Sequence, residues 1–256
     1  MKNHTDRLIF HTAICAGASQ IATDGRRELD VLVATPSLRS GMEDNMVGSK
    51  NILIDNYYLI SILIILVGAV IVALYYRRRI MAREIVLITS LSALIAISRG
   101  VMAWAPEVKP VSALVITVAS IFGPVPGMII GALSAFLSNF FIGQGPWTPF
   151  QIIAWALLGF IGGFIKTDNK VIPMVLSIPM VLGIYSVIVN IASAILITGS
   201  LTLDSFVTME ISGFPLDLVH TGCTVVVIFF AWKPLRKKLM RMYTKYGILA
   251  RKRMEM

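Results

Sequence analysis

Residues 171–198 read VIPMVLSIPMVLGIYSVIVNIASAILIT, a run of 28 residues without one charged side chain. About 20 apolar residues in a helix cross the hydrocarbon core of a bilayer, so this run is long enough to span it. Lipid offers no partners to backbone N–H and C=O groups, which restricts a spanning segment to a helix or to a closed barrel. The run lacks the alternating polarity of a barrel strand, and this selects the helix. Pro173 and Pro179 mark points where so long a helix would start or kink.

Six further apolar segments lie on either side of this run, at residues 57–76, 84–104, 111–123, 127–142, 150–165 and 212–232. The segments at 111–123, 127–142 and 150–165 are short and are separated by Gly/Pro turns. Short helices leave room for polar loops that enter the protein, which suits a ligand cavity. The sequence therefore predicts an all-α polytopic membrane helix bundle with a six-helix core and one extra N-terminal transmembrane helix. The predicted divisions are a tail at 1–56, the extra helix at 57–79, the core at 80–233 and a basic tail at 234–256.

Charge is scarce and clustered in this chain of 256 residues, of which 56% are hydrophobic and 14% charged. Soluble domains carry about 25% charged residues. Of the 23 Lys and Arg residues, 15 lie in 77–83, 166–170, 233–245 and 251–253, at the ends of apolar runs. The net charge of +9 thus marks membrane topology rather than a nucleic-acid surface. The positive-inside rule predicts a cell-membrane protein with its N-terminus outside and its C-terminus in the cytoplasm.

Small residues recur at four-residue spacing in three of the segments. This spacing lets helix backbones approach closely, either inside the bundle or at a docking face for a partner protein. The stripe in segment 84–104 is the better candidate for docking. The residues concerned are Gly127, Gly131 and Ala135; Gly159 and Gly163; and Ser92, Ala93, Ala96 and Gly100.

The densest local signal is residues 138–149, SNFFIGQGPWTP. Two glycines and two prolines permit and fix an unusual turn. This favours a preformed binding loop in which Gln144 and Trp147 face a ligand, over an ordinary interfacial turn with a Trp at the membrane surface. We expect Trp147→Ala to weaken ligand binding without unfolding the bundle, because an exposed loop contributes little to helix packing.

Arg99, Asp217 and His220 are polar, ionisable residues inside the apolar segments. Arg99 either extends to the outer surface or lines a polar pocket. Asp217 and His220 are three residues apart on one helix face, and form either a functional site or a structural polar pair. The sequence has no catalytic or ATP-binding motif, and one core histidine with one aspartate is too few ligands for a metal.

With these residues identified, the chain resembles the substrate-binding S components of energy-coupling-factor (ECF) transporters over about residues 82–241. The resemblance lies in the blocks at 109–111 (KPV), 122–127 (FGPVPG), 138–149 and 214–220 (FPLDLVH). It implies a membrane subunit that captures a vitamin-class molecule outside the cell and docks on a transmembrane scaffold protein carrying two ATPases. No cofactor is expected to stay bound, and ATP is expected to be used by those partner subunits only.

The resemblance also implies which residues bind. The outer loops and outer halves of the last three helices form the pocket in the family, which maps onto Lys109, Asn139, Gln144, Trp147, Gln151, Trp155, Tyr185, Asn190, Asp217 and His220. Docking maps onto Ser92, Ala93, Ala96 and Gly100, although the family's Ala-x-x-x-Ala pattern is not kept. The outer-loop block resembles a cobalamin-type subgroup, which makes cobalamin the leading ligand expectation; other vitamins remain open.

Two other functions stay open on the residues alone. One is an intramembrane enzyme that uses Asp217 and His220 as an acid–base pair. The other is a structural membrane subunit whose small-residue stripes only pack against partners.

Overall fold

The computed structural model describes residues 59, 62–64, 66–68, 70, 82–198 and 201–245. The N-terminal tail expected at 1–56 lies outside the described residues. So does most of the extra helix expected at 57–79, whose described residues are helical. Every regular element in the described part of the chain is a helix, which confirms the all-α membrane bundle.

The core begins with four helices: α6 (Ala82–Val101), α7 (Val111–Phe122), α8 (Pro124–Ile142) and α9 (Thr148–Gly162). A helical stretch of 28 residues follows, composed of α10 (Val171–Met180), the π-helical segment η1 (Val181–Ser186) and α11 (Val187–Thr198). The last helix is α12 (Leu203–Lys245). Within the described residues, four helical stretches are long and apolar enough to cross a membrane, while α7 and α9 are shorter.

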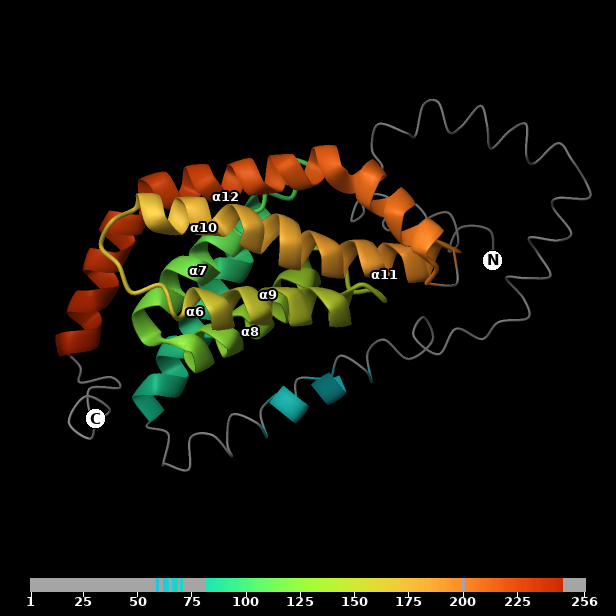
Figure 1. Ribbon diagram of the computed structural model, residues 1–256. Helices are drawn as coiled ribbons and strands as arrows, with labels where there is room; N and C mark the ends of the chain where they lie inside the picture. Colours follow the sequence, from blue (N-terminus) through green and yellow to red (C-terminus); the bar gives the residue numbers. More distant parts are fainter. Residues whose placement is uncertain are drawn as a thin grey trace, which may run out of the picture.

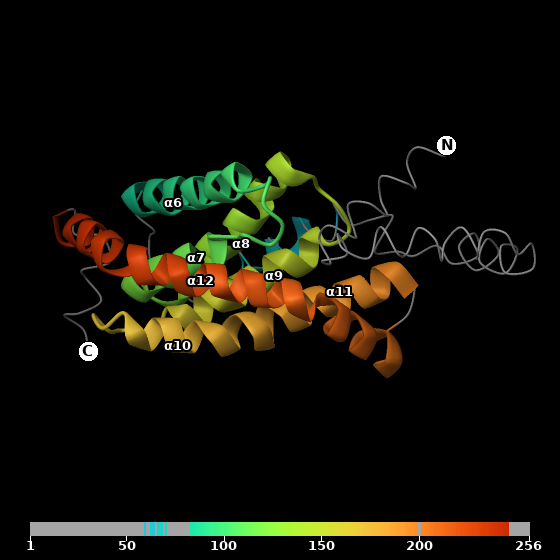
Figure 2. The ribbon, with the colours of Figure 1, turned by 90° about the horizontal axis from the view of Figure 1, so that it is seen from above.

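The short helix α7 is the centre of the bundle. It packs against α8, α9 and α12, and most of its side chains are buried. In Figure 2, α6 lies at one edge of the bundle and the stretch from α10 to α11 at the opposite edge. With 12 residues, α7 is only about 18 Å long, against about 30 Å of hydrocarbon. The loop at 102–110 enters the bundle to reach the first residue of α7, and Glu107 of this loop is buried.

Gly123 explains why α7 is short. Its φ of 97° lies in a region that favours glycine, and its N–H bonds to the carbonyl of Ala119 at 2.8 Å. Pro124 follows as the first residue of α8, where its missing N–H has no helical partner to lose. The predicted start of this helix at 127 is three residues too late, because the turn takes only one residue.

The contact between α8 and α9 is made by backbone against backbone. A Cβ atom added to Gly131 would meet the carbonyl group of Trp155, and one added to Gly159 would meet that of Gly127. The small-residue stripes of these two helices therefore serve internal packing.

Helix α12 differs most from the prediction. The apolar segment predicted for this helix was 212–232, so residues 203–211 and 233–245 were not expected to belong to it. Thr202 and Ser205 instead start it as a reciprocal capping pair, with the Ser205 N–H donating to Thr202 Oγ1 at 3.1 Å and the Thr202 N–H to Ser205 Oγ at 2.9 Å. The helix also continues through Pro215 and Pro234, and Figure 1 shows it bending towards both of its ends.

The long stretch at 171–198 remains helical past Pro179 because the helix changes there from α to the wider π form. Proline lacks the N–H that would bond to the carbonyl four residues earlier and crowds that carbonyl. Residues 181–186, which begin two positions after Pro179, form the π-helical segment η1. Such segments carry one extra residue per turn and often lie at functional sites. Here η1 carries Tyr185, which is buried in the centre of the bundle.

Candidate ligand-binding site

A chain of hydrogen bonds links α7, α9 and α12 in the middle of the bundle. Ser112 Oγ lies 2.8 Å from His220 Nε2, and Trp155 Nε1 donates to the same oxygen at 3.0 Å. His220, Ser112 and Trp155 are all fully buried. Ser112 thus holds both rings in fixed positions, which is the requirement for a preorganised site.

Tyr185 of η1 completes an aromatic wall with these two rings. Its ring centroid lies 5.0 Å from that of Trp155 and 4.6 Å from that of His220, the latter in an edge-to-face arrangement. Centroid separations of about 4.5–7 Å are typical of stabilising aromatic pairs. The three rings come from α9, η1 and α12, so the wall exists only in the folded bundle.

Arg99 connects the aromatic wall to two polar side chains of α8. Its Nη1 donates to Ser138 Oγ at 2.7 Å and to Asn139 Oδ1 at 2.6 Å, and its Cζ lies 4.8 Å from the centre of the Trp155 ring. The side chain is only 2% exposed. Arg99 therefore lines the polar interior, and the alternative that it extends to the outer surface is wrong.

Asn139 relays this contact to α9. Its Nδ2 donates to Thr148 Oγ1 and to Gln151 Oε1, both at 3.0 Å. Thr148 in turn donates to Gln144 Oε1 at 3.1 Å. Thr148 is the first helical residue of α9, and its hydroxyl fastens the preceding loop to Asn139.

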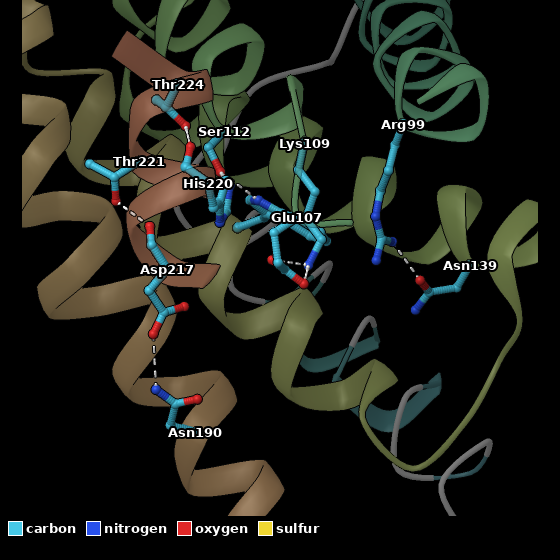
Figure 3. Close-up of polar contacts among 11 residues, drawn as sticks. Arg99, Glu107, Lys109, Ser112, Asn139, Asn190, Asp217, His220, Thr221 and Thr224 are labelled. Atoms are coloured by element: carbon cyan, nitrogen blue, oxygen red, sulfur yellow. Dashed lines mark hydrogen bonds and ion pairs between the residues drawn. The ribbon is translucent and has the colours of Figure 1, made fainter. Parts of the chain in front are cut away.

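The entering loop brings an ion pair beside the aromatic wall. Glu107 accepts from Lys109 Nζ at 2.8 and 2.7 Å, and Lys109 Nζ lies 5.8 Å from the centre of the Tyr185 ring. Glu107 is buried and has a φ of 57°, which is uncommon for a residue other than glycine. Figure 3 shows the pair between His220 and Arg99.

Asp217 and His220 do not form a pair with each other. Asp217 accepts from Asn190 Nδ2 at 3.2 Å, whereas His220 is bonded to Ser112. In Figure 3, Asp217 points towards Asn190 and His220 towards Ser112. The expectation that they are neighbouring partners is wrong, because each bonds to a different helix. The acid–base pair of the enzyme alternative therefore has no geometric support.

Three buried polar atoms around the wall have no hydrogen-bond partner among the described residues: Arg99 Nε, Gln151 Nε2 and His220 Nδ1. A buried polar atom without a partner costs about 1–3 kcal/mol. Two of them are N–H donors, and His220 Nδ1 donates or accepts according to the tautomer. Each of the three is therefore a candidate contact for a polar atom of a ligand.

The structure therefore brings together most of the predicted site residues. Asn139, Gln151, Trp155, Tyr185, His220 and Lys109 surround one region. Gln144 bonds within its own loop, to the carbonyl of Phe136 at 3.2 Å, and Asn190 with Asp217 forms a separate contact between α11 and α12. The site residues predicted from the sequence did not include Ser112, Ser138 and Glu107. Ser112 directly follows the KPV block at 109–111, which is the signal that could have identified it.

Trp147 lies elsewhere than expected. Its side chain is only 7% exposed and it packs over Gly145, where an added Cβ atom would meet its ring. The premise that this loop is exposed and unimportant for packing is therefore wrong.

The predicted docking stripe faces inward as well. Ser92 and Ala96 are buried, and Ser134 of α8 donates to the Ser92 carbonyl at 3.4 Å. A Cβ atom added to Gly100 would touch the ring of Phe141, while Ala93 is partly exposed. A docking role for this helix stays a prediction, and it cannot rest on the side chains of Ser92 and Ala96 in this conformation.

These features define a class: a multi-pass membrane protein with a polar, aromatic-lined site inside a helical bundle. The model of one family, described as the ECF-type riboflavin transporter S component, matches residues 79–237, more than half of the chain. The chain belongs to this family of substrate-specific ECF transporter subunits, which are transport proteins and not enzymes. No curated protein and no solved structure matched.

Proposed function

We propose that this protein binds a flat aromatic vitamin of the riboflavin type at the wall formed by Trp155, Tyr185 and His220. The observation that carries the proposal is the combination of this wall with the unpartnered atoms of Arg99 and Gln151. A planar heterocycle that stacks on an aromatic side chain and carries several acceptors complements such a site. The description of the matching family supports the same ligand class.

The cobalamin expectation receives no support from the family match, whose description names riboflavin. Cobalamin therefore becomes the competing ligand in the test rather than the leading one. Transport would depend on an energising module, in which we place a transmembrane scaffold subunit and two ATPases. In this proposal ATP is used by those partners only, the ligand enters from outside the cell, and it leaves towards the cytoplasm.

Purification in detergent followed by denaturation tests the ligand. We expect a flavin to be released and identified by its absorbance and mass. Added riboflavin should lose fluorescence on binding to the ligand-free protein, because stacking on Trp155 quenches it. Trp155→Ala should abolish the quenching, while Trp104→Ala, which changes a Trp that is 81% exposed, should leave it intact.

Release of a corrinoid would contradict the proposed ligand. Quenching that survives Trp155→Ala in a folded variant would contradict the proposed place of the ligand on Trp155. Copurification of the energising module is a separate measurement. If no ATPase subunit copurifies with the protein from gently solubilised membranes, the proposed partners are contradicted. The ligand assignment is not affected by that result.

A further inference from the structure

An apolar groove runs along the bundle between the end of α9 and α10. Its volume is about 560 Å³, within the range of about 300–1,000 Å³ that holds a small organic molecule. Its walls are formed by Ile161, Phe164, Ile172, Leu176, Met180 and Ile184. Phe164 and Leu176 are 62% and 43% exposed, so the groove opens to the surroundings of the bundle.

The groove is long and follows the helix axis. From Ile172 to Ile184 a helix advances about 18 Å, more than half of the thickness of the hydrocarbon core. These residues belong to a stretch that is long and apolar enough to cross a membrane, and in a bilayer the groove would face acyl chains along this length. An acyl chain lying parallel to the helix would fill it. A protein helix, about 10–12 Å across, is a poorer match to a groove lined by so few neighbouring side chains.

One end of the groove is basic. Lys166 and Thr167 complete its lining at the loop between α9 and α10. The same loop borders a second hollow, which is lined by Lys233, Arg236 and Lys237 of α12 together with Asp168. Asp168 is paired with Arg236 Nε at 2.9 Å, so positive charge remains in excess at this end.

We propose that the groove binds one acyl chain of an anionic phospholipid, with its phosphate group against Lys166. The apolar wall accounts for the chain, and the surplus of basic side chains accounts for the sign of the headgroup. Basic pockets beside transmembrane helices are the recognised sites for such lipids. The proposal is independent of which vitamin the protein carries.

Native mass spectrometry of the full-length protein in detergent tests the site, with phosphatidylglycerol and phosphatidylcholine of identical acyl chains as probes. We expect phosphatidylglycerol to be retained preferentially. Leu176→Trp fills the groove and should abolish this preference, whereas Val175→Trp, at an exposed neighbour outside the groove, should preserve it. Lys166→Gln should lower retention about fivefold, the contribution of one lysine near an anionic surface, and Lys238→Gln should not.

Equal retention of the two lipids by the unmodified protein would overturn the proposal, as would equal effects of Lys166→Gln and Lys238→Gln. Normal lipid retention by Leu176→Trp together with loss of the energising module would make the groove a protein-docking surface instead, and this also overturns the proposal. Riboflavin binding is measured on each variant as a check of its fold. Because neither lipid measurement requires the vitamin, failure of the lipid proposal and failure of the proposed function are distinguishable.

Discussion

A guanidinium group inside a membrane bundle is stable only where its donors are used. Arg99 meets this condition through Ser138 and Asn139, and it lies over Trp155. One side chain thus links α6 to the polar atoms of α8 and to the aromatic wall on α9. The remaining unpartnered Nε atom is what makes Arg99 a candidate ligand contact as well as a structural one.

Arg99→Met should weaken ligand binding about tenfold or more, because hydrogen bonds to a charged group contribute about 1.5–3 kcal/mol. Fluorescence titration with riboflavin measures the change. Arg83→Met, at the exposed other end of α6, is the matched control and should bind normally. Unchanged affinity in Arg99→Met would remove this side chain from the site.

Trp147→Ala should destabilise the protein, in contrast to the expectation from sequence. Replacement of a buried Trp by Ala costs about 3–5 kcal/mol. Thermal unfolding in detergent should show a lower midpoint for Trp147→Ala and no change for Trp104→Ala, which alters an exposed Trp. Equal midpoints in the two variants would mean that the loop does not depend on Trp147 for its packing.

The family resemblance could identify part of this candidate site. It implied Asn139, Gln151, Trp155, Tyr185 and His220, and the ionisable His220 also stood out within its apolar run because such a residue is costly in lipid. The partner of His220 could not be predicted in the same way. Ser112 lies 108 residues earlier in the chain, and the contact depends on how α7 and α12 are placed by all the other helices.

At the scale of elements, the crossing of α8 and α9 sets the position of the site. Gly131 lies against the backbone of Trp155, so close packing at this point fixes the helix from which the indole projects. The sequence predicted the stripes on these helices and their spacing. It did not predict that the stripe at Ser92 and Ala96 is internal too, since spacing does not state which face meets which neighbour.

Gly131→Ala should lower both the yield of folded protein and its thermal midpoint, because an added methyl group must displace the backbone of α9. Overpacking of this kind costs about 1–3 kcal/mol. Gly222→Ala, in α12 with open space around the position, is the matched control and should be neutral. Similar midpoints for the two variants would show that the helices separate at little cost.

Helix ends were the least predictable part of the elements. Six of the seven apolar runs correspond to the six helical stretches in residues 82–198 and 201–245. The start of α12 was missed because Asp204, Thr208 and Glu210 are typical of a loop, and the capping pair of Thr202 and Ser205 gives only a weak local pattern. The short length of α7 was predicted, because Pro110 and Gly123 bound it on both sides.

At the scale of the whole molecule, the short α7 and the entering loop make the bundle asymmetric across the membrane. The polar site lies around the start of α7, and the basic cluster lies around the loop at 163–170 and the end of α12. Under the positive-inside rule we expect the basic end to face the cytoplasm and the start of α7 to lie on the outer side of the basic cluster.

Labelling of single cysteines tests this orientation. In a background with Cys15 and Cys223 replaced by Ser, an impermeant maleimide should label Trp104→Cys on intact cells and Lys238→Cys only after permeabilisation. Both positions are exposed, so accessibility within the fold is matched. The reverse labelling pattern would invert the topology and, with it, the proposed direction of transport.

The widened turn at η1 has a consequence for comparing this chain with others. Among the buried residues of the stretch, one row recurs at an interval of four, at Pro173, Ser177, Val181, Tyr185, Val189 and Ser193. In a uniform α-helix each such step drifts by about 40°, so this row would wind around the helix and leave the core. A π turn absorbs one additional residue and takes back about 100° of that drift. An alignment with a homologue whose helix is α throughout would therefore need a one-residue gap beside Tyr185, in a run that otherwise aligns without interruption.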